Sequence, residues 1–239
     1  MRKKFCTWMN RPDIPVYLGE ELPLVRPYVD AMDTHGEDGL GESHYPQITN
    51  GTINTDGVGF LARTLHEAAQ KEEPVSIIAL GPLTNLARLV QNDPESLAGL
   101  GELISMGGSC QSHGNCSPVA EYNYWCDPHA AEIVYRAFEE LPVLQDKQIH
   151  MVGLDVTRKI VLTPDIFRIH VLCESADGGN VSEILPGSIL IFTGNRKESS
   201  AVSSMIRLQS LTLSTVLSAA EWKPVRELQR KVCASDRAL

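Results

Sequence analysis

A short apolar run rich in branched residues, VSIIAL at residues 75–80, is the feature that most constrains the fold. Such a continuous run is typical of a strand buried on both faces of a sheet. The next residues, GPLTNLARLVQ, follow without a linker and carry apolar side chains at helical spacing, so they predict a helix with one buried face. A buried strand that leads directly into a helix is the unit from which parallel sheets are built.

The same alternation recurs on both sides of this unit. Residues 58–73 predict an amphipathic helix, and residues 102–106 and 149–154 predict two further strands. Between those strands, Asp127 followed by Pro128 is typical of a helix N-terminus, because Asp can accept a backbone hydrogen bond and Pro fits the first helical position. The fold class is therefore α/β, with an open, mostly parallel, Rossmann-like sheet flanked by helices.

Three unusual stretches follow the predicted strands: GPLTN after Leu80, GGSCQSHGN after Met106 and DVT after Leu154. In open α/β sheets, ligands bind at the carboxyl ends of the strands. The glycine-rich stretch matches neither the dinucleotide-binding pattern nor the P-loop pattern. We therefore expect a ligand site at this edge of the sheet, without one of the common phosphate-binding loops.

Composition and charge exclude several classes of partner. The formal net charge is -9 and there is no basic run, which argues against nucleic acid or an anionic membrane. No apolar run approaches the ~18 residues of a membrane span, and the basic start is not followed by the apolar segment of a signal peptide. The cysteines form no CxxC pair, and the spacing of Cys110, His113 and Cys116 fits no common zinc module. We expect a cytoplasmic protein with reduced thiols.

The stretch GNCSPVAEYNYWCDP, residues 114–128, places polar side chains among small and aromatic ones. In an extended segment, Glu121 and Asn123 would point to the same side. A carboxylate and an amide together can bind vicinal hydroxyls, because Glu accepts hydrogen bonds and Asn both donates and accepts. This favours a sugar as ligand; the alternative is a loop whose polar groups satisfy nearby backbone. His35, in the glycine-rich stretch 33–46, is either a proton donor or part of a solvated loop.

Six stretches occur in this order along the chain: RPDIPVYLGEELPL, HGEDGLG, IALGPLTNLA, SMGGS, GNCSPVAEYNYWCDPHAA and MVGLDVT. Through them, residues 11–163 resemble the inosine-uridine preferring nucleoside hydrolases. The resemblance implies hydrolysis of the N-glycosidic bond of purine or pyrimidine ribonucleosides to ribose and free base. It also implies a calcium ion that holds the ribose hydroxyls and the attacking water. The expected assembly is a homodimer or a homotetramer.

The resemblance also assigns roles to individual residues. His35 matches the histidine proposed to protonate the leaving base in pyrimidine-preferring members. The ribose contacts of the family fall on four positions of this sequence, the first of which lies against the sugar: Met106, Asn115, Glu121 and Asn123.

The metal site of the family is matched only in part. Leu80 matches the position whose backbone carbonyl is a calcium ligand, whereas Asp155 lies before the family's ligand, and we interpret it as structural. Neither the early Asp-x-Asp-x-x-x-Asp-Asp motif nor the later His-Asp-Pro motif occurs in these 239 residues. We therefore expect calcium to be bound poorly or not at all.

These departures divide the chain into two parts. Residues 1–172 are expected to form a partial nucleoside hydrolase domain, incomplete at both ends, and residues 173–239 a divergent tail. The tail is either an authentic C-terminus or the product of a shifted reading frame, since a shifted frame through residues 204–213 permits His-Asp-Pro. We expect negligible hydrolysis by this chain. The alternative is a non-catalytic remnant that binds ribose or a nucleoside.

Overall fold

The computed structural model describes residue 6 and residues 13–36, 53–159 and 189–192. Its centre is a four-stranded sheet in the order β3-β2-β1-β4. The strands are β1 (Val75–Ala79), β2 (Leu100–Met106), β3 (Ile149–Val152) and β4 (Ile189–Phe192). All three neighbouring pairs are parallel, which confirms the predicted fold class. The third strand ends at Val152, two residues before the predicted end, because Leu154 already begins a helix.

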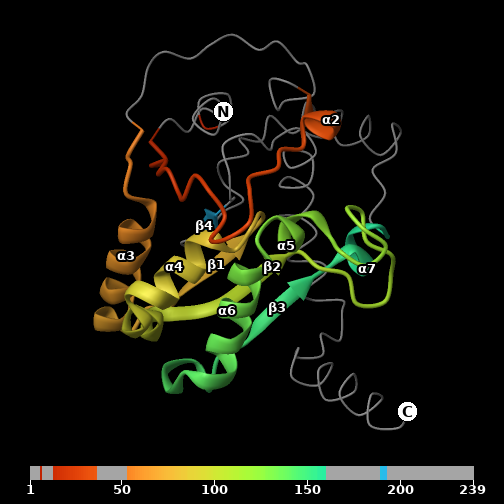
Figure 1. Cartoon of the computed structure of the whole chain (residues 1–239). Coiled ribbons are helices and arrows are strands. Elements are labelled where there is room, and N and C mark those ends of the chain that lie inside the picture. The colour runs from red at the N-terminus through yellow and green to blue at the C-terminus, as the bar shows by residue number, and fades with distance from the viewer. Residues whose placement is uncertain (1–5, 7–12, 37–52, 160–188, 193–239) are drawn as a thin grey trace, which may run out of the picture.

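Three longer helices accompany the sheet: α3 (Gly57–Lys71), α4 (Thr84–Asn92) and α6 (Pro128–Glu140). Helix α4 contacts both α3 and α6, and Figure 1 shows α4 and α6 in front of the strands. The short helical segments are α2 (Met32–His35), η1 (Pro94–Gly99), α5 (Tyr122–Cys126), η2 (Pro142–Leu144) and α7 (Leu154–Thr157). Buried side chains from the helices and strands form one core, and its largest fully enclosed hydrophobic members are Leu61, Leu65, Ile77, Leu83, Leu89, Leu100, Leu103, Val134 and Leu144.

Helix α6 begins where the sequence predicted. The carboxylate of Asp127 accepts a hydrogen bond from the backbone N–H of Ala130 at 3.1 Å, and Pro128 occupies the first helical position. The same carboxylate is completely buried. Its second oxygen accepts from the Thr84 hydroxyl at 2.7 Å and from the Leu24 backbone N–H at 2.9 Å. One aspartate thus joins the starts of α4 and α6 to the N-terminal segment.

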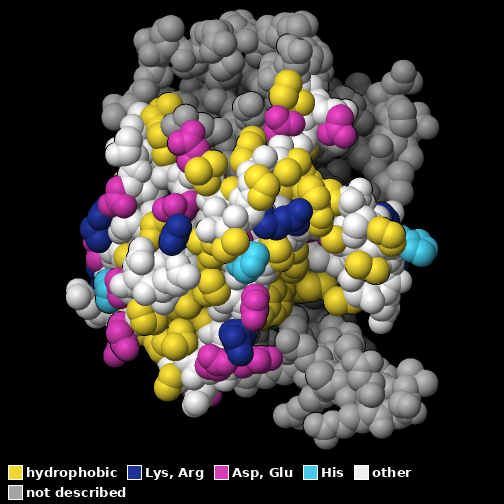
Figure 2. Space-filling model, viewed as in Figure 1, with side chains coloured by type: hydrophobic (Ala, Val, Ile, Leu, Met, Phe, Trp, Pro, Cys, Tyr) yellow, Lys and Arg dark blue, Asp and Glu magenta, His cyan; other side chains and the backbone are white. Residues whose placement is uncertain are grey.

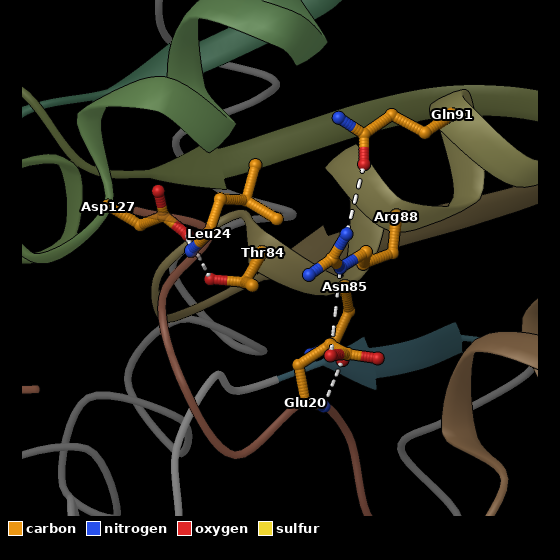
Figure 3. Close-up of polar contacts among 7 residues, drawn as sticks. All are labelled: Glu20, Leu24, Thr84, Asn85, Arg88, Gln91 and Asp127. Carbon is orange, nitrogen blue, oxygen red and sulfur yellow. Dashed lines mark hydrogen bonds and ion pairs between the residues drawn. The ribbon is translucent and has the colours of Figure 1, made fainter. Parts of the chain in front are cut away.

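A second polar contact fixes that N-terminal segment beside α4. The side-chain oxygen of Asn85, a buried residue, accepts from the backbone N–H of Glu20 at 2.7 Å. Figure 3 shows Asn85 and Thr84 on the same helix, each directed to the passing chain. Further along, Arg26 donates to the Trp125 carbonyl at 2.6 Å and lies over the Trp125 ring. The chain from residue 20 to residue 26 therefore crosses the ends of α4 and α5 in a fixed position.

The outer face of α6 is polar. Figure 2 shows charged and histidine side chains along α6, with hydrophobic side chains exposed beside them. Arg136 lies 3.7 Å from Glu132 and 3.5 Å from Glu140, but exposed pairs of this kind each contribute only about 0.2–1 kcal/mol. Helix α6 is therefore held mainly by its buried face. Among the described residues, no helix combines the length and the apolar character that crossing a membrane requires.

The expected boundary at residue 173 lies outside the described residues. Strand β4 is the described part of the expected tail, and it pairs with β1 along its whole length. This strand is not among those predicted from the sequence. Its signal was the apolar run ILIF at residues 189–192.

Candidate ribose-binding site

The candidate site lies at the carboxyl ends of β1 and β2, where open α/β sheets bind ligands. The last pair between β1 and β2 is Ala79 with Ser105, so Leu80 and Met106 are the next residue along each chain. After Met106 the chain turns through Gly107 and Gly108. Gly108 has φ +75, in the left-handed region that favours glycine.

Glu121 is the N-cap of α5, and its carboxylate is bound by backbone N–H groups. One oxygen accepts from Asn123 at 3.0 Å, and the other accepts from Gly108 at 2.9 Å and from Tyr124 at 3.2 Å. The side chain is buried, and this desolvation raises the pKa of the carboxyl above its usual range, although the N–H groups oppose the shift. A carboxylate has about four lone-pair positions, of which the described residues fill three.

The expectation of an extended segment through residues 121–123 is wrong. Tyr122–Cys126 is helical, and only Glu121 has extended backbone angles. The cause is the carboxylate itself, because an N-cap acceptor satisfies the first free N–H groups and starts the helix. The alternative suggested by the sequence, polar groups that satisfy nearby backbone, therefore describes a large part of what Glu121 does.

Asn123 is also buried, and its orientation is fixed. Its side-chain nitrogen donates to the carbonyl oxygen of Met106 at 3.0 Å and to the Met106 sulfur at 3.2 Å. A carbonyl can only accept, so the amide nitrogen must face Met106. The Asn123 side-chain oxygen accepts no hydrogen bond from a described residue. It is available to a ligand hydroxyl.

Asn115 reaches the same helix end from the preceding loop. Its side-chain oxygen accepts from the backbone N–H of Tyr122 at 2.8 Å, and its own backbone N–H donates to Ala120 at 3.0 Å. Asn115 is exposed, and its side-chain nitrogen makes no hydrogen bond within the described part of the chain. The amide therefore presents a donor toward solvent beside Glu121.

The structure thus brings together the four residues predicted to contact ribose, through hydrogen bonds that join Met106 to Asn123 and Asn115 to the helix capped by Glu121. Leu80 is buried and directly follows β1, one position beyond the last pair of the register, Ala79 with Ser105. His35 is the last residue of α2, and its side chain lies outside the described residues.

The described residues do not form a calcium site. Calcium takes six to eight oxygen ligands, usually with several carboxylates. Within residues 13–36 and 53–159 and the few others described, no group of three or more Asp, Glu, His or Cys side chains converges. Leu80 offers one carbonyl. The Asp155 carboxylate accepts from the backbone N–H groups of Cys110 at 2.8 Å and Gln111 at 2.6 Å, which agrees with a structural role.

A chain of buried hydroxyls lies next to the site, and it was not predicted from the sequence. The Tyr124 hydroxyl is 2.9 Å from the Ser105 hydroxyl and 2.8 Å from that of Tyr135. Burial raises the pKa of Tyr124 to about 12. A Cβ added at Gly107 would lie 2.1 Å from the Tyr124 ring, so the ring packs directly on the turn after β2. No sequence pattern relates residues 105, 124 and 135, because the contact joins a strand to two different helices.

Comparison with known proteins identifies the family. The family described as inosine-uridine preferring nucleoside hydrolase matches residues 2–225, almost the whole chain. The chain belongs to this nucleoside hydrolase family. This confirms the resemblance on which the residue roles rest. The match continues beyond residue 173, so it includes most of the expected tail.

Several named relatives agree with this assignment. A pyrimidine-specific ribonucleoside hydrolase of Klebsiella pneumoniae is 37% identical over 196 residues, which cover 82% of this chain and 58% of the relative. The enzyme of the same name from Escherichia coli O1:K1 is 40% identical over 156 residues, 65% of this chain and 46% of the relative. The chain therefore spans about half the length of the curated relatives it matches.

Solved structures give the same fold. A purine-preferring ribonucleoside hydrolase from Gardnerella vaginalis has a TM-score of 0.57 and 25% identity over 66% of this chain and 48% of its own. A plant nucleoside hydrolase has a TM-score of 0.54 and 30% identity over 68% of this chain and 48% of its own. The parallel sheet and its helices are thus those of a nucleoside hydrolase.

Proposed function

We propose that this chain binds a pyrimidine ribonucleoside through its ribose, at the site formed by Asn115, Glu121 and Asn123. The observation that carries the proposal is the set of polar atoms that the described residues leave available. These are the side-chain oxygen of Asn123, one acceptor position on Glu121, and the side-chain nitrogen of Asn115. The choice of a pyrimidine base rests on the relatives at 37–40% identity, which are named pyrimidine-specific.

Two acceptors beside one donor suit a pair of vicinal hydroxyls. Each hydroxyl donates one hydrogen bond and can accept others. The Asn123 oxygen and the Glu121 carboxylate accept the two hydroxyl protons, and the Asn115 amide donates to a hydroxyl oxygen. A hydrogen bond to a buried carboxylate is stronger than one between neutral groups, so Glu121 contributes most to recognition of the sugar.

Hydrolysis of the N-glycosidic bond is the family's reaction, but we propose that these 239 residues alone do not carry it out. Activation of water requires a strong base or a metal held by several ligands. The described residues hold one candidate calcium ligand, and the acidic motifs of the family do not occur in the sequence. Calcium is therefore expected to be bound poorly or not at all, and the ribose site to act in binding alone.

Titration calorimetry with uridine, 2′-deoxyuridine and uracil tests the binding proposal. Uridine should bind, 2′-deoxyuridine should bind about tenfold more weakly because one hydroxyl is missing, and uracil should not bind measurably. Equal affinity for uridine and 2′-deoxyuridine, or no binding of uridine by the folded chain, would contradict it.

Release of uracil from uridine, followed by chromatography with and without calcium, tests the second part. The proposal expects no release above the rate without protein. Calcium-dependent release that disappears in Glu121→Ala would show that the chain is a working hydrolase.

A further inference from the structure

Helix α7 and the residue after it, Arg158, contact the loop that leads from β2 to Asn115 at three places. The first is a backbone contact, in which the N–H of Leu154 donates to the carbonyl of Gly108 at 2.9 Å. The other two are made by charged side chains, Asp155 and Arg158. None of these residues belongs to the candidate ribose site itself.

Asp155 binds backbone N–H groups in the first half of the loop. Its two carboxylate oxygens accept separately from consecutive backbone N–H groups, those of Cys110 at 2.8 Å and Gln111 at 2.6 Å. Partial burial acts to raise the pKa of Asp155, but these N–H groups outweigh it, so the pKa lies below the ordinary value of 3.8. The carboxylate is therefore ionised and bonded at neutral pH.

Arg158 binds backbone carbonyl groups in the second half of the loop. One guanidinium nitrogen donates to the carbonyl of His113 at 2.6 Å and to the hydroxyl of Ser112 at 3.3 Å. The other donates to the carbonyl of Gly114 at 2.9 Å. The rigid fork of a guanidinium is suited to two neighbouring acceptors, which a single ammonium group cannot reproduce.

The Asp155 carboxylate and the Arg158 guanidinium bind complementary backbone groups of the loop. Residues three positions apart lie on the same side of a helical turn, so Asp155 and Arg158 face the loop together. The carboxylate takes backbone donors and the guanidinium takes backbone acceptors. Backbone groups of the loop that would otherwise bond to water are thus bonded to these two side chains.

The held loop ends at the ribose site on both sides. The N–H of Gly108 donates to the Glu121 carboxylate at 2.9 Å, and Gly114 directly precedes Asn115. We propose that Asp155 and Arg158 are positioning residues of the ribose-binding site, which set the places of Asn115 and Glu121 by fixing the loop between them. This inference rests on the proposed function.

Two variants and two matched controls test it in the full chain. Asp155→Asn keeps the size of the side chain but replaces one acceptor by a donor, so it must lose one of the two loop bonds. Arg158→Gln removes the fork. The controls Asp146→Asn and Lys159→Gln make the same charge changes at exposed residues. Hydrogen exchange of the peptide covering residues 109–116 and uridine affinity are measured for each.

We expect exchange in residues 109–116 to become about tenfold faster in both variants, while exchange in β1 and β2 stays unchanged. Uridine affinity should fall about 5- to 10-fold. Asp155→Glu, which keeps two acceptor oxygens, should recover part of both effects. The controls should match the unaltered chain.

Unchanged loop exchange in Asp155→Asn and Arg158→Gln would overturn the inference. So would faster exchange of equal size throughout the sheet, because that would be a general loss of stability. Faster loop exchange with unchanged uridine affinity would equally overturn the positioning role. Failure of the unaltered chain to bind uridine contradicts the proposed function instead, and it is seen before any variant is made.

Discussion

The side-chain amide of Asn123 donates to both the carbonyl oxygen and the sulfur of Met106, at 3.0 and 3.2 Å. This contact joins α5 to the carboxyl end of β2. It also fixes the orientation of the amide, because the nitrogen donates to Met106 and the oxygen therefore points away from it. A residue inferred to bind ribose is therefore held in place by another residue inferred to lie against the sugar.

Asn123→Asp tests this orientation. The new carboxylate cannot donate to Met106, and it would lie buried beside a second carboxyl group, that of Glu121. We expect a loss of about 3 kcal/mol in the free energy of unfolding, measured by urea denaturation, together with loss of uridine binding. Asn92→Asp at the exposed end of α4 is the control and should cost less than about 1 kcal/mol. A cost for Asn123→Asp no larger than that of the control would contradict the orientation.

Glu121→Gln is expected to change how stability depends on pH. Burial raises the pKa of Glu121 above its ordinary value of 4.5. An acid with a raised pKa in the folded state contributes stability below its unfolded pKa, and this contribution is lost as the pH rises through the folded pKa. The variant cannot titrate. The stability of the unaltered chain relative to Glu121→Gln should therefore decrease from pH 4 toward neutrality.

Urea denaturation of both proteins at several pH values measures this difference. A difference that is constant with pH would mean that the pKa of Glu121 is not raised. A difference that increases with pH would mean that the backbone N–H groups outweigh the burial.

Loss of Asp127 is expected to cost more stability than loss of a partly exposed helix cap such as Asp93. Asp127→Ala removes the common acceptor of three donors, the Leu24 and Ala130 backbone N–H groups and the Thr84 hydroxyl. These donors then lack a partner at a buried position. We expect a cost of about 3 kcal/mol or more, including the loss of the helix cap. Asp127→Asn retains one acceptor, which can still cap α6, and should cost about half as much.

The measurement is the urea midpoint of each Asp127 variant, with the slope of the transition checked for two-state behaviour. Asp93→Ala is the comparison, because Asp93 also caps a helical segment but is only half-buried. If Asp127→Ala lowers the free energy of unfolding no more than Asp93→Ala does, the three buried hydrogen bonds to Asp127 do not contribute as proposed.

The core of this fold could be predicted because its signals are local. Residues 75–80 form an apolar run of the length of a strand, and Asp127–Pro128 marks a helix start within one turn. Helix α5 was missed because Tyr122–Cys126 is too short to show a helical period, and because its N-cap, Glu121, is not one of the residue types preferred at that position. The holding of the loop by Asp155 and Arg158 could not be predicted, since their partners are backbone atoms that any sequence would supply.

The residues proposed to contact ribose were found by resemblance, and their residue types alone left two interpretations open. The structure shows why: Glu121 and Asn123 each use some of their polar atoms for backbone contacts and leave others available. A sequence pattern cannot separate these two uses. Only the assignment of individual donor and acceptor atoms does so.

Tyr124→Phe tests the buried hydroxyl chain next to the site. The ring stays, so packing on Gly107 is kept, but the hydroxyls of Ser105 and Tyr135 lose a partner at 2.9 and 2.8 Å. A buried hydroxyl left without a partner costs about 1–3 kcal/mol, so we expect a loss of this size in the free energy of unfolding. Tyr17→Phe is the matched control, because the Tyr17 ring stacks on Phe60 and the change should cost less than about 0.5 kcal/mol.

A double-mutant cycle with Tyr135→Phe separates the hydroxyl contact from general effects of the substitution. If the two hydroxyls interact, the double variant should be more stable than the sum of the single losses predicts, by about 0.5–1.5 kcal/mol. The pKa of Tyr124, raised by burial to about 12, gives an independent check: ultraviolet titration of the folded chain should show no phenolate from this residue below about pH 11. Strict additivity in the cycle, with a phenolate signal near pH 10 that is lost in Tyr124→Phe, would mean that the Tyr124 hydroxyl is solvated and does not interact with that of Tyr135.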